Sequence, residues 1–154
     1  DVCSSDLTAC ASEDVGNADP RALTVAVSAA QAVERIGMPE AQIILSQAAT
    51  YVACAPKSNS ACNAIFAANE EVRRSGNLPI PSHLQDAHYK GAAKLGHGTG
   101  YKYAHDYPNH YVEQQYLPYE LTGKKYYEPS WNGYEAKIRE HMKRIKDEAK
   151  QKED

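Results

Sequence analysis

The segment 96–102 (GHGTGYK) carries the residue types of a phosphate-binding loop. A P-loop needs G-x-x-x-x-G-K-[ST] between a strand and a helix, so that backbone N–H groups and a lysine converge on phosphate. The segment lacks that spacing, and Tyr101 stands where the third glycine of G-x-G-x-x-G belongs. It does not predict nucleotide binding, and we expect no cofactor within this chain.

Three histidines and an aspartate in the same region raise the question of a metal: His97, His105, His110 and Asp106. Imidazole and carboxylate suit zinc or iron. The histidine spacings of eight and five match no compact ligand motif, so we expect hydrogen-bonded loop histidines and no metal site. No G-x-S-x-G elbow is present either, so no catalytic residue is predicted and the chain by itself is not expected to be an enzyme.

Basic and aromatic residues interleave in the second half of the chain. Tyrosines can stack on bases while lysines contact phosphate. Acidic neighbours such as Glu113 and Glu120 oppose that interpretation. Packing of the tyrosines on the protein body is therefore favoured, and DNA contact stays the alternative. Its candidates are Lys90, Lys94, Lys102, Lys124 and Lys125.

Composition and charge indicate a folded protein. Of 154 residues, 42% are hydrophobic and 24% charged, which is close to the globular average, and the net charge of -3 shows no polyanion-binding excess. The four cysteines form no C-x-x-C pair, so reduced structural thiols are favoured over a disulfide or metal role. No apolar stretch is long enough for a membrane helix and no signal-peptide pattern is present, so a cytoplasmic location is expected.

The first seven residues resemble the translation of a sequencing adaptor, and we leave residues 1–7 out of the fold prediction. On that interpretation the natural protein continues upstream, and the chain is a fragment of it.

The elements expected to carry these residues are mainly helices. Asp19 and Pro20 suit the start of a helix that ends at Gly37. A second helix is expected from about residue 40 to Pro56, and a third, capped by Ser58 or Asn59, up to Gly76. Apolar residues recur at helical spacing in all three, which predicts antiparallel neighbours, and residues 8–15 should end a further helix. Residues 8–76 are thus predicted to form one helical domain.

The second part, residues 77–154, should pack on the same body. A short helix is expected over 83–95, followed by an irregular Tyr- and Gly-rich arm up to Pro129, in which no clear period of 2 or 3.6 is visible. Ser130 suits the cap of a last helix whose apolar face begins at Tyr134. Glu135 is assigned to its charged faces together with Lys137 and Arg139. The predicted fold class is all-α.

Several ordered motifs resemble one family over about residues 9–140. They are segments 11–16 (ASEDVG), 18–22 (ADPRA), 55–59 (APKSN), 86–92 (DAHYKGA), 96–103 (GHGTGYKY), 105–108 (HDYP), 115–118 (QYLP) and 126–129 (YYEP). On these residues the chain resembles the C-terminal region of the replication-associated recombination protein A family, also called MgsA, whose eukaryotic relative is the Werner helicase interacting protein. Ala104 and Cys62 depart from the proline and the aromatic residue usual in that family.

The resemblance implies a clamp-loader-like AAA+ ATPase whose helical C-terminal part, residues 8–76 above all, forms a homotetramer. It implies action on DNA at replication forks, a nucleoid-associated location, and ATP and Mg²⁺ in an ATPase domain that precedes this region. The residues that carry the motifs are Ser12, Glu13, Asp14, Asp19, Pro20, Lys57, Ser58, Asn59, His88, Tyr89, Lys90, His97, Gly98, Gly100, Tyr101, His105, Asp106 and Tyr107.

Overall fold

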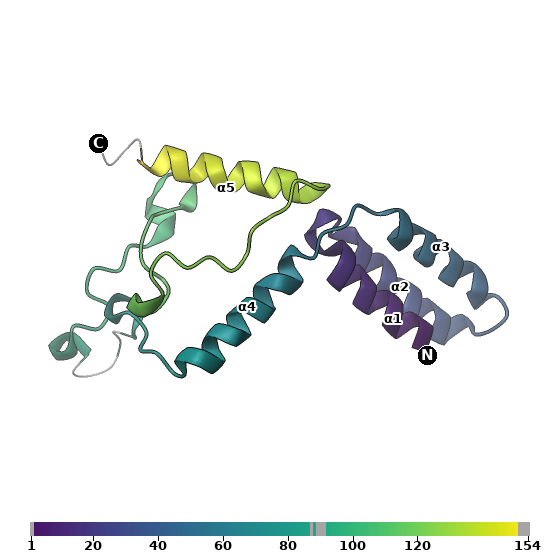
Figure 1. Ribbon diagram of the computed structural model, residues 1–154, viewed down its shortest axis with the longest axis horizontal. Helices are drawn as coiled ribbons and strands as arrows, with labels where there is room; N and C mark the ends of the chain where they lie inside the picture. Colours follow the sequence, from purple (N-terminus) through teal and green to yellow (C-terminus); the bar gives the residue numbers. More distant parts are fainter. Residues whose placement is uncertain (1, 87, 89–91, 151–154) are drawn as a thin grey trace. The chain divides into compact units, whose positions relative to one another are not determined.

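The computed structural model describes residues 2–86, 88 and 92–150, and over that part of the chain it contains helices and loops and no strand (Figure 1). The predicted all-α class is therefore confirmed. The α-helices are α1 (Val2–Cys10), α2 (Arg21–Ile36), α3 (Ala41–Cys54), α4 (Ser60–Ser75) and α5 (Tyr134–Lys150).

Helix α2 begins and ends where its capping residues predict. Asp19 is extended, and its carboxylate accepts a hydrogen bond from the backbone N–H of Arg21 at 3.2 Å. Gly37 follows the last turn with φ +73°, and its N–H donates to the carbonyl of Val33 at 2.9 Å. A positive φ costs glycine little, so this residue can end the helix without strain.

Helices α1, α2 and α3 pack side by side around a core of small residues (Figure 1). The core consists of Ala11, Val15, Ala22, Ala26 and Val52, all buried. Alanine at three of these positions lets the backbones approach closely, because no long side chain holds them apart. Leu7 of α1 packs against the core, so the helix that contains residues 2–7 contributes to this body. The interpretation of residues 1–7 as a translated sequencing adaptor stays a prediction.

A wide helical turn follows α1. Residues Ala11–Val15 form a π-helical turn, closed by a hydrogen bond from the Gly16 N–H to the Ala11 carbonyl. The predicted helix end over 8–15 is thus present, although its last turn is wider than an α-helical one.

Helix α4 does not pack along α2 or α3, in contrast to the predicted row of antiparallel neighbours. Residues 55–59 are non-helical, with Ala55 extended at ψ 147°, and they turn the chain out of the bundle. Consequently the expected core stripe of α4 lies in solvent at Ile65 and Val72, and the one residue of this helix that is buried is Glu71.

The arm between α4 and α5 consists of turns and extended segments. The predicted helix over 83–95 is wrong: short 3₁₀ turns span Ser82–Leu84 and Ala92–Leu95, and Gln85 between them is extended. Both turns are single turns of four residues or fewer, as is usual for 3₁₀ structure. The irregular course predicted for 96–129 is confirmed, with three further 3₁₀ turns and no strand in that range.

The chain divides into two compact units, each discontinuous in sequence. Unit 1 comprises Asp1–Asn69 and Tyr126–Glu140, and unit 2 comprises Glu70–Lys125 and His141–Asp154. This division differs from the boundary drawn at residues 76 and 77 from sequence. Among the described residues, none of the helices combines the length and apolar character that crossing a membrane would require.

Candidate functional site

A fully buried carboxylate lies in unit 1. Glu135, in the first turn of α5, is 0% exposed. Its Oε2 accepts hydrogen bonds from the Ser58 hydroxyl at 2.6 Å and the Ser130 backbone N–H at 2.8 Å, and its Oε1 accepts one from the Tyr127 hydroxyl at 2.9 Å. We call Glu135, Ser58, Tyr127 and Ser130 the Glu135 cluster. The assignment of Glu135 to a solvated face is wrong, because three donors replace its water.

The ionisation of this carboxylate follows from its partners. Burial opposes the charged form of Glu135, but the hydrogen bonds from Ser58, Ser130 and Tyr127 outweigh it and hold its pKa below the ordinary value. Burial and the nearby carboxylate in turn raise the pKa of Tyr127 against the lowering effect of Asn17. At neutral pH the cluster is thus an ionised carboxylate facing neutral donors, an arrangement that stabilises the charge.

Three separate segments of unit 1 hold the cluster in place. The Ser58 N–H donates to the Asp14 carbonyl at 2.8 Å, and the Asn17 side chain donates to the Tyr127 hydroxyl at 3.3 Å. The Asn132 side chain donates to the carbonyl of Lys57 at 2.9 Å. These bonds connect the turn after α1, the α3–α4 connection and the segment before α5.

Two glycines allow these segments to approach each other. A Cβ on Gly16 (φ +50°) would lie 2.8 Å from the Ser58 carbonyl oxygen. A Cβ on Gly133 (φ +54°) would lie 2.7 Å from Cγ of Pro56 and closer still to the Ala18 carbonyl oxygen. Both positions therefore require glycine for space as well as for backbone conformation.

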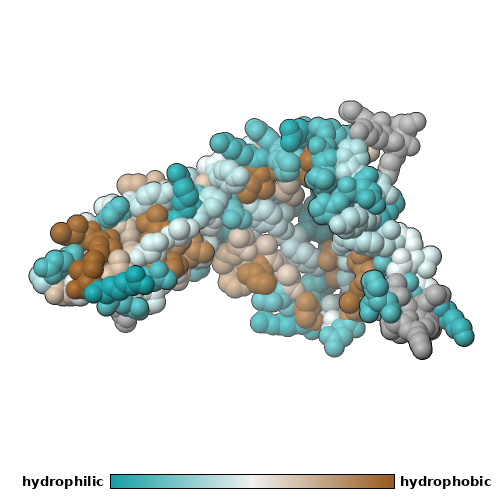
Figure 2. Space-filling view, turned by 180° about the vertical axis from the view of Figure 1, so that it is seen from behind, coloured by the Kyte–Doolittle hydropathy of each residue, from teal (hydrophilic) through white to brown (hydrophobic). Residues whose placement is uncertain are grey.

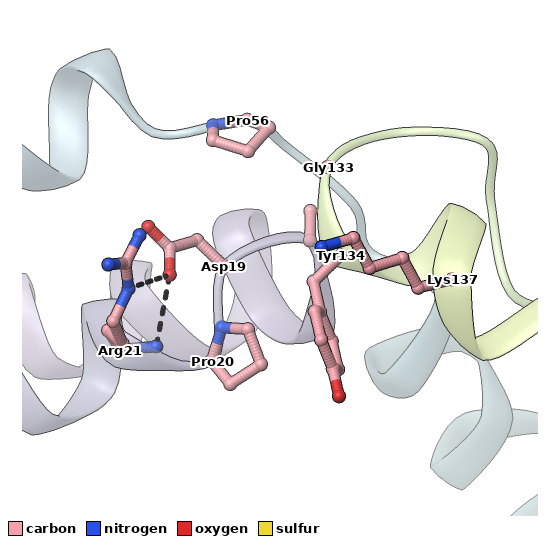
Figure 3. A pocket seen from close by; sticks show the side chains of 8 residues that line it. Asp19, Pro20, Arg21, Pro56, Gly133, Tyr134 and Lys137 are labelled. Carbon is pink, nitrogen blue, oxygen red and sulfur yellow. Dashed lines mark hydrogen bonds and ion pairs between the residues drawn. The ribbon is translucent and has the colours of Figure 1, made fainter.

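A cavity of about 680 Å³ lies in unit 1, and its lining includes Gly133 and Tyr134, the two residues before Glu135 (Figure 3). Pro20, Pro56, Gly133 and Tyr134 supply its less polar lining. The Asp19 carboxylate at its edge accepts a hydrogen bond from the Tyr51 hydroxyl at 2.6 Å and pairs with Arg21 at 3.1 Å. Burial acts against ionisation of Asp19, but the bonds from Tyr51 and Arg21 prevail and lower its pKa. This carboxylate is a helix cap with its hydrogen-bonding capacity in use, which does not fit a general base.

The first group of family-motif residues is distributed along this same region. Ser12, Glu13 and Asp14 are exposed on the π-helical turn. The Lys57 ammonium donates to the carbonyls of Val52, Ala53 and Ala55 and so caps the last turn of α3. The side-chain oxygen of Asn59 accepts a hydrogen bond from the side-chain NH2 group of Asn63 on α4. With Asp19, Pro20 and Ser58, these motifs converge on the junctions between helices of unit 1.

The second group lies in the arm of unit 2. The His88 backbone and ring both contact the Asp86 carboxylate, the ring Nδ1 at 2.8 Å, whereas Tyr89 and Lys90 lie outside the described residues. Gly98 and Gly100 have positive φ in a turn around His97, and the Gly98 N–H donates to the Ser82 carbonyl at 2.9 Å. Tyr101, Asp106 and Tyr107 are exposed.

The histidines and cysteines form no site of their own in the described part of the chain. The His105 and His110 rings lie against each other with centroids 4.9 Å apart, and no group of three or more His, Cys, Asp or Glu is placed there to hold a metal. Cys10, Cys54 and Cys62 form no disulfide in this part of the chain. The Cys10 thiol donates to the Asp14 carboxylate at 3.1 Å, and this bond, with burial, raises the thiol pKa.

The structure brings some of the candidate DNA-contact lysines together. Lys124 and Lys125 line one cavity of unit 2, and Lys124 pairs with Glu71 at 3.2 Å. The backbone of Lys102 is bonded to the Gln114 side chain, which lines the same cavity. Lys94 is exposed and does not line it, and Lys90 lies outside the described residues. Sequence reasoning missed Lys146 of α5, which does line it.

These contacts define an all-helical structural module in which the polar residues cap helices and join segments. The chain matches the family described as MgsA AAA+ ATPase C terminal over residues 5–146, and it belongs to that family. The resemblance inferred from the motifs is therefore confirmed.

Similarity to known proteins is high over most of the chain. It is 48% identical to replication-associated recombination protein A of Bacillus subtilis over 82% of its length and 43% identical to the Escherichia coli K12 protein of that name over 87%. It is 39% identical to ATPase WRNIP1 of Dictyostelium discoideum over 77%. The matched regions cover 30%, 30% and 14% of those relatives, so the chain corresponds to less than a third of each. The family is thus one of AAA+ proteins whose members are named for replication and recombination.

Proposed function

We propose that this chain is the oligomerisation region of an AAA+ ATPase that acts in replication-fork maintenance, recombination and repair. The observation that carries the proposal is a groove of about 370 Å³ between α2 and α3, lined mostly by small side chains such as Ala29, Ala32 and Ala48. Small residues let a helix of a second copy approach closely.

Large apolar side chains are also exposed on α2, on α3 and in the connection between them. Ile36, Met38 and Ile43 are exposed, with Ile43 at 74%, and Figure 2 shows apolar areas on this part of the molecule. Exposed apolar area of this kind marks interaction sites in soluble proteins. A homotetramer, as the family resemblance implies, would bury it.

The whole protein would supply the chemistry. We expect it to be a DNA-dependent ATPase that binds ATP and Mg²⁺ in a separate domain and works on DNA in the cytoplasm, associated with the nucleoid. This expectation is consistent with the AAA+ family and with the names of its relatives. In this proposal the present chain holds copies of that motor together.

Sedimentation equilibrium of the 154-residue chain tests the proposal. The wild type should sediment as a defined oligomer, and Ile43→Glu should dissociate it because a charge would replace an exposed apolar side chain of α3. Ile80→Glu, at an exposed apolar residue of unit 2, is the matched control and should leave the oligomer intact. A monomeric wild type at high concentration would remove the proposal.

Contact with DNA is the second candidate function. It is supported by the cavity of unit 2 at which Lys124, Lys125 and Lys146 meet. Binding through phosphate contacts should weaken steeply as salt is added, because each contact releases counterions.

A further inference from the structure

A basic and aromatic cavity of about 380 Å³ lies within unit 2. We call it the lysine–tyrosine cavity, after Tyr111, Tyr116, Lys124, Lys125 and Lys146 in its lining. Two stretches of the arm and the second half of α5 form it. Its volume is near the lower end of the roughly 300–1,000 Å³ typical of small-ligand sites, which leaves room for about one nucleotide and excludes a duplex.

The charges of the lining favour an anion. Lys124 pairs with Glu71, and Glu113 adds one carboxylate to the lining. Neither Lys125 nor Lys146 pairs with a carboxylate among the residues that the structure describes. Two cations that pair with no described carboxylate thus line one cavity from different elements, which suits a phosphate backbone.

The tyrosines supply an aromatic surface. Tyr116 is 54% exposed, and its hydroxyl accepts a hydrogen bond from the Gln114 side chain at 2.9 Å, which orients the ring. Tyr111 is half-buried, and burial together with Glu113 raises its pKa, so that it stays neutral beside a phosphate. An exposed, oriented aromatic ring next to cations is the combination that binds unpaired bases by stacking.

The amides of the lining are already occupied. Gln114 accepts a hydrogen bond from the Lys102 N–H and donates to the Lys102 carbonyl, and the Gln115 side chain donates to the carbonyl of Leu117 at 2.7 Å. Side-chain amides are common readers of base edges. Because the Gln114 amide and the NH2 group of Gln115 are bonded within the protein, the cavity offers stacking and charge but little sequence discrimination.

We propose that the lysine–tyrosine cavity binds one nucleotide of single-stranded DNA without sequence preference, with Tyr116 stacked on the base and Lys125 and Lys146 contacting phosphates. This proposal rests on the second candidate function, contact with DNA, and assigns it a place. It also explains why the lysines at 124 and 125 follow a tight turn at Gly123, whose φ of +78° brings the chain back toward α5.

Fluorescence anisotropy of the 154-residue chain with labelled oligo(dT), about 20 nucleotides long, tests the site. Tyr116→Ala should weaken binding roughly tenfold, the loss expected for one stacked base. Lys125→Gln and Lys146→Gln should each reduce the slope of log affinity against log salt by about 0.7, the value for one phosphate contact on a single strand. Oligo(dA) should show the same changes.

Matched controls separate the site from general charge. Lys143→Gln removes the same charge from the exposed surface of α5, and Tyr119→Ala removes an exposed tyrosine of the arm, both outside the cavity lining. Both should bind as the wild type does. If the wild type binds but Tyr116→Ala and the two lysine variants match the controls, the cavity is the wrong place while DNA contact stands. If the wild type shows no salt-sensitive binding, the second candidate function fails as well.

Discussion

Replacing Glu135 should destabilise unit 1 more than replacing any exposed acidic residue. The carboxylate accepts three hydrogen bonds and is fully buried, so Glu135→Ala leaves the Ser58 hydroxyl, the Tyr127 hydroxyl and the Ser130 N–H without an acceptor. Each unsatisfied buried donor costs about 1–3 kcal/mol.

The magnitude follows from that count with allowance for relaxation. Water entering the space would satisfy part of the set, so we expect a loss of about 3–5 kcal/mol for Glu135→Ala, a large share of the roughly 5–15 kcal/mol of a typical domain. Glu135→Gln keeps one acceptor oxygen, but its NH2 group would face one of the groups that now donate to the carboxylate. We therefore expect an intermediate loss of about 2–3 kcal/mol.

Urea unfolding followed by far-UV circular dichroism measures these losses. Glu140→Gln on the same helix is the control, because Glu140 is exposed, and it should stay within about 0.5 kcal/mol of the wild type. A double-mutant cycle between Ser58→Ala and Glu135→Gln should give a coupling energy of about 0.5–3 kcal/mol. Additive effects, or a Glu135→Ala variant as stable as the control, would refute the conclusion that this carboxylate holds segments of unit 1 together.

Other predictions concern a glycine near Glu135 and the carboxylates with lowered pKa values. Gly133→Ala should lower stability by about 2–3 kcal/mol more than Gly123→Ala. Both glycines have positive φ, but the added methyl group would meet protein atoms at residue 133 only. Thermal unfolding of the two variants measures the difference. Stability should also fall with pH in the acid range. The carboxylates of Asp19, Glu71 and Glu135 all have lowered pKa values in the folded chain, so the unfolded chain binds more protons in the acid range. Their contribution to the free energy of unfolding is fully present above the ordinary pKa values of about 4. It is lost as pH falls through the pKa values of the folded chain. Urea midpoints from pH 7 to pH 3 test this, and a constant midpoint would contradict it.

Local signals in the sequence predict the helices of unit 1 well. Asp19, Pro20 and Gly37 bound α2 to within a residue or two, since capping chemistry acts over a single turn. The apolar face of α5 is also predicted in part, because Ile138, Met142 and Ile145 are partly buried. Tyr134, assigned to the same face, is exposed instead.

Long-range contacts are what the sequence does not predict. Glu135 resembles its charged neighbours, and its partner Ser58 lies 77 residues away, so no periodicity connects the two. The apolar stripe of α4 is as regular as those of α2 and α3, yet its Ile65 and Val72 are exposed, because the direction of the α3–α4 connection decides their environment. Lys146 is not among the lysines predicted to contact DNA, because only the fold shows that this part of α5 lies beside the arm.

The bond between Ser58 and Glu135 also sets the order of events during synthesis. On the ribosome, α1, α2 and α3 can assemble as soon as they emerge, since their contacts are close in sequence. The hydroxyl of Ser58 cannot bond Glu135 until some 77 further residues have been translated. A chain that ends before residue 135 would therefore lack the hydrogen bond between Ser58 and Glu135. We expect proteases to cleave such a chain more readily than the complete one.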